Sequence, residues 1–215
     1  AITLEGADHF VSGNDAVRVF EVTSTGDFTV NQATIKNGNV QDKGGGILNS
    51  GTLTVTRSTF TSNNSSTDYG SGGGGIWSEG TLTITGSTVS NNSTTYGGGG
   101  IFNSGALTVT NSIFSGNSVT HSGSGSGGGI YTENTLTITG STFSGNSAGM
   151  LGGGVLNFGG MFTITDSTFS NNSAIDAGGI YNHHGTGTIT RSSISSNLAS
   201  SAAGILNNGT LTVAN

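Results

Sequence analysis

The sequence predicts an all-β protein, a right-handed parallel β-helix (β-solenoid) of about nine coils with three short strands in each coil. Three observations lead to this fold class. A glycine motif that ends in an apolar residue recurs every 25 or 29 residues. Apolar residues alternate with threonine inside each repeat, which is the period of a strand. The composition, with 40 Gly, no Pro and 7% charged residues, is that of a periodic chain rather than an ordinary globule.

The glycine motif sets the length of the repeat. The gaps between copies are 29, 25, 29, 25, 25 and 25 residues, and a regular period of this size is typical of a solenoid. Parallel strands stacked coil on coil place equivalent residues about 4.8 Å apart, and right-handed winding is the rule for parallel crossovers. The last, apolar residue of the motif stands at Ile47, Ile76, Ile101, Ile130, Val155, Ile180 and Ile205.

The pattern also extends upstream of the first glycine motif. Phe28 and Val30 fill the roles of later apolar pairs, and Ile2 and Leu4 fill them one unit earlier. We therefore expect nine coils, the last incomplete, in a single domain. That domain covers residues 1–215, with less regular coils over 1–43 and regular repeats over 44–215.

The strand after each glycine motif reads like TLTVT at residues 52–56. A period of two points Leu53 and Val55 inward and the threonines outward, at spacings of about 4.8 Å and 6.8 Å. Two interpretations stay open, because threonine suits a pleated surface but a regular grid could also bind a surface such as ice. The candidate binding residues of this threonine array are Thr52, Thr54, Thr56, Thr81, Thr83, Thr85, Thr108, Thr110, Thr135, Thr137, Thr139, Thr163, Thr165, Thr188 and Thr190.

A further apolar position is followed three residues later by asparagine, as in Phe60 with Asn63. Asparagine favours turns, and its amide can bond both the backbone and the asparagine of the next coil. We therefore predict a structural asparagine ladder, formed by Asn63, Asn92, Asn117, Asn146, Asn172 and Asn197. A second row has the same interpretation and contains Asn49, Asn103, Asn157, Asn182 and Asn207, interrupted by Ser78 and Thr132.

The segments RVFEV at residues 18–22 and GGGILNSGTLTVTRSTFTSNNS at residues 44–65 resemble the right-handed parallel β-helix repeat proteins of bacterial cell surfaces. The pairing of GGGI with FTSN is similar to the GGxI and FxxN repeats of polymorphic outer membrane proteins. The likeness covers essentially the whole chain, but its motifs specify the shape of a coil and nothing catalytic. It implies a secreted or surface-displayed, extracellular protein with a role in adhesion.

Charge and composition argue against several classes of function. The formal net charge is −6, from 11 acidic and 5 basic residues, so the chain lacks the basic face that nucleic-acid binding needs. It has no Cys, hence no disulfide framework and no cysteine metal site. No apolar run reaches the ~18 residues of a membrane span. We therefore expect no nucleic-acid partner, no insertion of this chain into a membrane and no cofactor.

Candidates for catalysis are few, and we expect no catalytic residue and no metal site. Glu79 and Glu133 share a turn position, but a coil without a carboxylate lies between them, so they should be about 10 Å apart. Neither has a neighbouring base that would tune it. His183 and His184 are adjacent, and neighbours on an extended chain point to opposite faces, so they would not chelate one metal together.

Two loops are enlarged, at residues 61–75 and 115–129. The apolar residues that flank them are 16 residues apart, against 11 or 12 in other coils. Tyr69 and Trp77 accompany the first loop, and His121 lies in the second. Loops with aromatic residues could hold a sugar, although solvated Gly/Ser segments are the commoner case.

We therefore expect a non-enzymatic extracellular β-solenoid that acts as a surface stalk, an adhesive passenger or a self-stacking filament unit. One alternative is an ice-binding protein, because the threonine array resembles the T-x-T arrays of insect hyperactive antifreeze proteins. Another is a β-helix that binds or degrades polysaccharide. The expected partners are a cell surface, a glycan, ice, or a second copy stacked head to tail, since AITLE and TLTVAN share one inward pattern and neither carries a cap.

Overall fold

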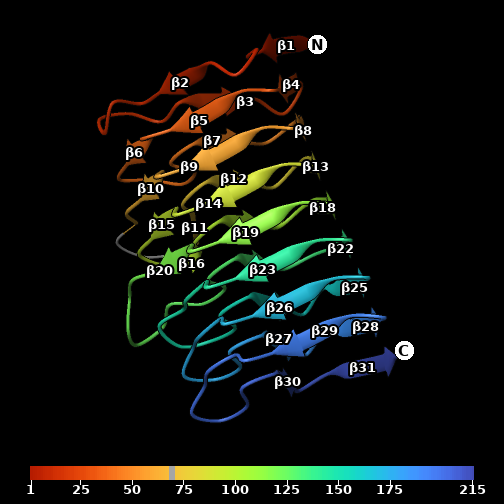
Figure 1. Ribbon diagram of the computed structural model, residues 1–215. Coiled ribbons are helices and arrows are strands. Elements are labelled where there is room, and N and C mark those ends of the chain that lie inside the picture. Colours follow the sequence, from red (N-terminus) through yellow and green to blue (C-terminus); the bar gives the residue numbers. More distant parts are fainter. Residues whose placement is uncertain (68–70) are drawn as a thin grey trace.

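The computed structural model describes residues 1–67 and 71–215. Its strands wind into coils that are stacked along one axis, with the N-terminal coil at one end and β31 at the other (Figure 1). Three long sheets, here named A, B and C, run along this axis. Over the described residues, sheets B and C have one strand in each of eight coils and sheet A has a ninth, β31. The expected nine coils, with the last incomplete, are thereby confirmed.

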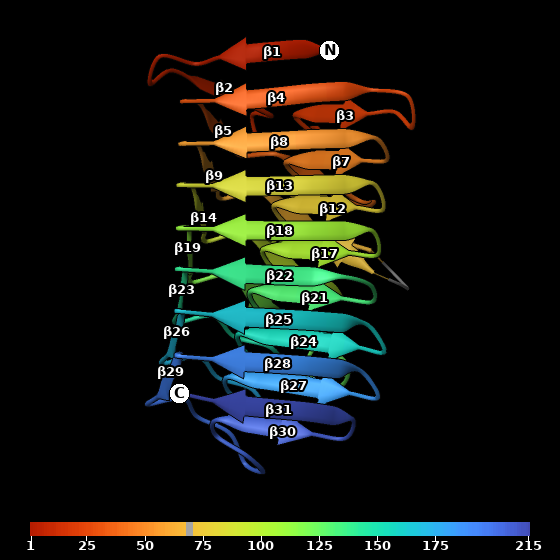
Figure 2. The same ribbon diagram turned by 90° about the vertical axis from the view of Figure 1, so that its right-hand side faces the viewer.

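Sheet A carries the alternating threonine strands, which lie one above the other in Figure 2. Equivalent residues are in register, so that Leu53 pairs with Leu82 and Thr54 with Thr83 in parallel strands. The strands are β1 (Ile2–Glu5), β4 (Asp27–Asn31), β8 (Thr52–Thr56), β13 (Thr81–Thr85), β18 (Ala106–Thr110), β22 (Leu136–Thr139), β25 (Met161–Thr165), β28 (Thr186–Thr190) and β31 (Thr210–Ala214).

Sheet B follows sheet A in each coil after a sharp bend. The bend contains one residue in the left-handed region, such as Arg57 with φ of 47° or Asn111 with φ of 48°, and asparagine and glycine tolerate this region best. A similar residue follows sheet B, for example Asn91 with φ of 54°. The strands are β2 (Phe10–Ser12), β5 (Thr34–Lys36), β9 (Thr59–Thr61), β14 (Thr88–Ser90), β19 (Ile113–Ser115), β23 (Thr142–Ser144), β26 (Thr168–Ser170) and β29 (Ser193–Ser195).

Sheet C follows the glycine motif, and its strands run opposite to those of sheet A (Figure 2). The glycines allow neighbouring coils to touch through their backbones, because a Cβ on Gly99 would collide with the carbonyl oxygen of Gly128. The strands are β3 (Phe20–Val22), β7 (Ile47–Asn49), β12 (Ile76–Ser78), β17 (Ile101–Asn103), β21 (Ile130–Thr132), β24 (Val155–Phe158), β27 (Ile180–His183) and β30 (Ile205–Asn207).

Several coils add one or two further strands of two residues each to the three that the repeat pattern predicts. These short strands lie between sheets B and C along the chain. Sheet D contains β6 (Asn39–Val40), β10 (Asn64–Ser65), β15 (Ser93–Thr94) and β20 (Ser118–Val119), and sheet E pairs β11 (Gly72–Gly73) with β16 (Gly97–Gly98). Single bridges, from Ser118 to Ser147 and from Ser147 to Ser173, continue sheet D toward the C-terminus.

The interior is a continuous column of apolar side chains contributed by sheets A, B and C. Leu53, Val55, Phe60 and Ile47 each have no exposed surface, which confirms the predicted inward positions. Aromatic rings on sheet B stack from coil to coil, with centroids 4.6 Å apart for Phe114 and Phe143, and 4.7 Å apart for Phe143 and Phe169. Because each ladder spans many coils, burial and stacking stabilise the coils jointly.

The predicted asparagine ladder is present and buried. In Asn92, the side-chain amide donates to Oδ1 of Asn117 (3.0 Å) and to the carbonyl oxygen of Phe60 in the preceding coil (3.0 Å). The backbone amide of Asn92 donates to the same Oδ1 of Asn117 (3.1 Å). Asn63 through Asn172 in this row have no exposed surface. Each amide therefore satisfies polar groups at a turn that burial would otherwise leave unpaired.

A serine ladder at the bend between sheets A and B was not predicted. The backbone amide of Ser87 donates to Oγ of Ser112 (3.1 Å), and the hydroxyl of Ser87 donates to the carbonyl oxygen of Thr85 (2.8 Å). The same pattern repeats along the row, which consists of Ser58, Ser87, Ser112, Ser141, Ser167 and Ser192. The recurring STF and STV sequences after the bend were its signal.

The second asparagine row lies at the end of the sheet C strands, and two of its positions hold Ser78 and Thr132 instead of asparagine. Asn157 donates to Oδ1 of Asn182 (2.9 Å), as predicted. Asn103 instead donates to Oγ1 of Thr132 (3.0 Å). Ser78 and Thr132 have no side-chain amide to offer the next coil, and Oδ1 of Asn103 and of Asn157 are accordingly buried without a partner.

Candidate functional site

The threonine array lies on the outer side of sheet A and is in register from coil to coil. Thr83 pairs with Thr54 on one side and with Thr108 on the other, and Thr163 pairs with Thr188. These threonines are half-buried or exposed, whereas the apolar residues between them are buried. The structure thus has the outward orientation that the sequence predicts, while binding through these residues stays a prediction.

The array is interrupted and bordered by charge. Ala106 and Met161 replace the first of the three threonines of the strand, the position of Thr52 and Thr81, and Met161 is 63% exposed. Thr135 lies one residue before β22 instead of inside it. At the bend that follows the third threonine of each strand, Arg191 forms an ion pair with Asp166 at 2.7 Å. This hydrogen bond and the positive charge lower the pKa of the Asp166 carboxyl.

A row of large side chains covers the outer side of sheet C, and we name it the outer row. The aromatic rings of this row stack on one another, with centroids 5.8 Å apart for Trp77 and Phe102 and 5.0 Å apart for Phe102 and Tyr131. Although Trp77 and Phe102 point away from the column, they are only 6% and 2% exposed, because neighbouring loops cover them. The outer row consists of Leu48, Trp77, Phe102, Tyr131, Leu156, Tyr181 and Leu206, each in register with the next.

Two neighbouring cavities lie along the outer row, and Ser71 lines both. Thr67 and Ser71 bring the first enlarged loop to the first cavity, and Ser124 and Ser126 bring the second loop to the second. The first cavity has a volume of about 440 Å³, and its walls include Asp42, Lys43, Trp77, Phe102, Ser104 and Glu133. The second has about 230 Å³, and its walls include Tyr96, Tyr131, Leu151, Leu156 and Phe158.

The aromatic residues that accompany the enlarged loops lie in different elements. Trp77, which flanks the first loop, belongs to strand β12. His121 stacks its ring on that of Tyr96, with centroids 4.5 Å apart. Tyr69 lies outside the described residues. Thr67, Ser71, Ser124 and Ser126 of these loops thus line the cavities together with members of the outer row.

Two residues that line the first cavity, Trp77 and Lys43, carry hydrogen-bond donors with no oxygen acceptor in the described part of the chain. The indole N–H of Trp77 is buried and unpaired, which costs about 1–3 kcal/mol for an ordinary buried polar group. The ammonium of Lys43 lies 4.1 Å from the centroid of the same indole, a cation–π contact. The described ion pairs involve Arg18 and Arg191 and not Lys43.

Glu133 supplies a carboxylate to the same cavity. Burial of the Tyr131 phenol, followed by the negative charge of nearby Glu133 and its interaction with the hydroxyl, raises the pKa of Tyr131. The Tyr131 hydroxyl therefore keeps its proton near neutral pH. Glu79 occupies the same turn two coils earlier, as predicted, because the backbone amides of Glu79, Ser104 and Glu133 make equivalent bonds to successive coils.

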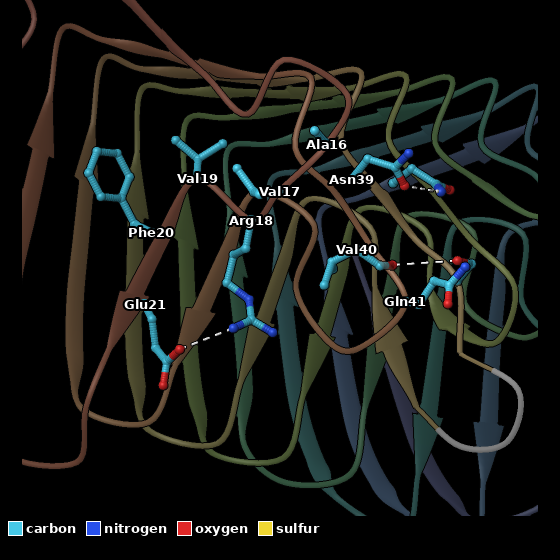
Figure 3. Close-up of a pocket in the computed structure, with 11 residues that line it drawn as sticks. Ala16, Val17, Arg18, Val19, Phe20, Glu21, Asn39, Val40 and Gln41 are labelled. Atoms are coloured by element: carbon cyan, nitrogen blue, oxygen red, sulfur yellow. Dashed lines mark hydrogen bonds and ion pairs between the residues drawn. The ribbon is translucent and has the colours of Figure 1, made fainter.

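A further cavity, of about 810 Å³, lies beside β3 and β6 near the N-terminus (Figure 3). Arg18 reaches toward Glu21 there, and each of its three nitrogens already donates a hydrogen bond. The acceptors are the carboxylates of Glu21 (3.1 Å) and Asp42 (2.9 Å) and the carbonyl oxygen of Lys43 (2.9 Å from Nη2 and 3.2 Å from Nε). Arg18 thus holds the 42–44 loop against β3, which is a structural role.

The prediction that His183 and His184 point to opposite faces is wrong. His184 has a φ of 58°, and this left-handed turn brings the two ring centroids to 4.2 Å. The Asn208 amide donates to the Tyr181 hydroxyl (3.0 Å), which is also hydrogen-bonded to Nδ1 of His183 (3.1 Å). Burial, and then the proximity of His184, lowers the pKa of His183. This arrangement favours a neutral His183.

Within residues 1–67 and 71–215, no group of three or more His, Asp or Glu side chains gathers in a way that could hold a metal ion. The same part of the chain contains no helix of the length and apolarity needed to cross a membrane.

Comparison with known proteins agrees with the fold. Residues 9–197 match the family described as the right-handed β-helix region, and the chain belongs to this family. The family description gives right-handed winding for the coils, and it does not identify an activity. No curated protein and no solved structure is significantly similar to the chain.

Sequence reasoning missed the outer row and the unpaired Trp77 N–H. The row had a signal, because the residue after the inward apolar residue of every glycine motif is Leu, Trp, Phe or Tyr. The cavities had none, since they depend on where Asp42, Lys43, Thr67 and Ser71 lie relative to that row.

Proposed function

We propose that the chain is a non-enzymatic, extracellular β-solenoid that serves as a rigid adhesive passenger on a cell surface. The observation that carries this proposal is the difference between its outer faces. Sheet A presents rows of threonine, whereas the side of sheet C gathers the stacked rings, Lys43, Glu133 and two cavities. Concave, aromatic walls with a few polar groups are typical of binding sites. The remaining faces then serve as scaffold.

Two features support the non-enzymatic and extracellular parts of the proposal. Glu79 and Glu133 lie at the same turn two coils apart, about 10 Å by coil spacing, beyond the ~6.5–9.5 Å of an inverting carboxylate pair. The resemblance of the repeat to cell-surface β-helix proteins supports the location.

Adhesion of the purified chain on beads tests this function. We expect the beads to bind cell surfaces or glycan arrays, and we expect Phe158→Arg to abolish that binding, because Phe158 is 44% exposed beside the second cavity. Thr108→Arg on sheet A is the matched control and should leave binding unchanged. Wild-type beads that bind nothing, or equal binding by both variants, would contradict the proposal.

Ice binding by the threonine array is the second candidate function. The register of Thr54, Thr83 and Thr108 across neighbouring strands favours it, because these strands lie one above the other as a regular face (Figure 2). Thermal hysteresis and inhibition of ice recrystallisation are the measurements. We expect Thr108→Tyr to remain folded and to lose any such activity, and a null result for the wild type at millimolar concentration eliminates this candidate.

Head-to-tail self-association is a separate prediction, which sedimentation over a concentration series checks.

A further inference from the structure

We propose that the cavity beside Trp77 binds a neutral sugar residue of a glycan, with the indole N–H of Trp77 and the ammonium of Lys43 donating hydrogen bonds to its oxygens. This inference rests on the adhesive function proposed above, and it names the ligand of the cavity and the residues that recognise it.

The size of the cavity fits such a ligand. Its volume is about 440 Å³, inside the range of roughly 300–1,000 Å³ that small-molecule sites occupy. The neighbouring cavity shares Ser71 with it. A glycan can therefore continue from the first cavity along the outer row toward Tyr131 and Phe158.

The polar groups of the wall require a ligand that both accepts and donates hydrogen bonds. The buried Trp77 N–H needs an acceptor, and no described residue supplies one. Glu133 and Asp42 bring carboxylates, and Ser104 brings a hydroxyl. A sugar hydroxyl can accept from the indole and donate to a carboxylate at the same time.

Charge favours a neutral sugar over an acidic one. The carboxylates of Asp42 and Glu133 and the ammonium of Lys43 line the cavity, and Asp42 is already paired with Arg18. Glu133 and the formal net charge of −6 would both repel an anionic glycan at short range. A neutral polyhydroxyl ligand meets no such repulsion and still uses every polar group of the wall.

Binding requires groups around Trp77 to move. The Trp77 nitrogen has no exposed surface, so its N–H meets a ligand only when the groups at that edge of the ring shift. The half-buried Lys43 lies over the face of the ring, and the four-carbon stem of lysine is flexible, so its ammonium can swing to an oxygen of the ligand.

The fluorescence of Trp77 reports on the site directly, because it is the only tryptophan of the chain. Neutral oligosaccharides, such as gluco-, galacto- and mannooligosaccharides, are titrated against the full chain, with galacturonate and glucuronate oligosaccharides as the acidic set. We expect a saturable change in emission with at least one neutral ligand and none with the acidic set. Isothermal titration calorimetry then gives the affinity of the variants, including one that lacks tryptophan.

Trp77→Phe keeps the ring and removes the N–H, and Lys43→Met keeps the stem and removes the ammonium. Each should weaken neutral sugar binding about tenfold, the typical effect of one lost hydrogen bond to a ligand. Lys36→Met is the matched control, since Lys36 makes a similar contact over Phe10 at 3.5 Å and does not line the cavity. Circular dichroism of each variant verifies that it is folded.

The outcomes separate this inference from the proposed function. Binding of acidic sugars only, no binding of any sugar by a folded wild type, or affinities unchanged by both Trp77→Phe and Lys43→Met would each overturn the inference. If beads carrying folded Trp77→Phe still adhere like the wild type while its sugar binding is lost, the sugar site stands and adhesion does not use it. If no beads adhere, the adhesive function fails regardless of sugar binding.

Discussion

Gly187 occupies an inward position at which the other regular coils of sheet A place leucine or phenylalanine. Phe162 of the preceding coil fills the space, because a Cβ on Gly187 would collide with the Phe162 ring. Phe162 is 3% exposed. A large and a small residue thus compensate each other across one coil, which maintains the dense packing of protein interiors.

This pair predicts a strong coupling in a double-mutant cycle. Gly187→Leu alone should overpack the column and cost about 1–3 kcal/mol, and Phe162→Leu alone should leave a cavity above Gly187. The double variant recreates the leucine pair of Leu53 and Leu82, so its unfolding free energy should exceed the additive value by at least about 1 kcal/mol. Urea denaturation measures all four proteins, and additive effects would contradict this packing.

Thr132→Asn should stabilise the protein by repairing the second asparagine row. The new amide would accept from Asn103, as the Thr132 hydroxyl does now, and would donate to the unpaired Oδ1 of Asn157. Pairing a buried acceptor is worth about 1 kcal/mol or more. Thermal unfolding measures the gain, and Thr137→Asn on the outer face of sheet A is the control that should give none. A lower melting temperature for Thr132→Asn would count against the assignment of this defect.

His183 should make stability depend on pH. Its pKa in the folded protein is lowered from 6.5 by burial and by His184, so the unfolded chain takes up the proton first as the pH falls. The contribution is therefore fully present above pH 6.5 and is lost as the pH drops below it. Melting temperatures between pH 5 and 8 should show this decline, and His183→Gln should reduce it. Identical pH profiles for the two proteins would disprove the role of His183.

At the scale of single elements, the stacked phenylalanines of sheet B are among the largest fully buried side chains of the core. Phe114 has no exposed surface and stacks on Phe143. Phe114→Ala should lower the unfolding free energy by about 3–5 kcal/mol. Ile113→Ala, next to it on the outer side and 48% exposed, should cost much less. A loss below about 1 kcal/mol for Phe114→Ala, well under the range for such a truncation, would mean that this ladder contributes little.

The strands that the sequence predicts are those with a measurable period. Leu53 and Val55 alternate with threonine, and Phe60 follows at a constant offset, so sheets A and B could be assigned coil by coil. The strands of sheets D and E contain two residues each, such as Asn64–Ser65, and two residues have no period. Their pairing follows from the coils above and below and not from local sequence.

The whole molecule is stabilised by contacts between neighbouring coils, so protection should vary along the axis. Strands such as β13 and β18 pair on both edges, whereas β1 and β31 pair on one in the 215-residue chain. We expect amide hydrogen exchange to be slowest around Leu107 and Val109 and fastest around Ile2 and Val213, as in other repeat proteins. Uniform exchange along the chain would instead indicate one cooperative unit.

The candidate site was less predictable than the fold for a physical reason. The enlarged loops and Trp77 were noticeable in the sequence, but the cavity depends on the path of the 41–44 and 66–67 segments over the outer row. Whether the indole N–H of Trp77 finds an acceptor depends on the orientation of one ring among several neighbours. Neither property repeats from coil to coil, so the repeat pattern of the sequence does not predict it.

The asparagine ladder also gives the molecule an electrical direction. From Asn63 to Asn172, every side-chain amide donates to the Oδ1 of the asparagine that follows. The amide dipoles therefore add head to tail along the axis, and hydrogen bonds arranged in a chain polarise one another. A column of uncharged side chains thus gives the solenoid a lengthwise polarity. Two ends built from the same repeat then differ in the potential that they present to a charged partner.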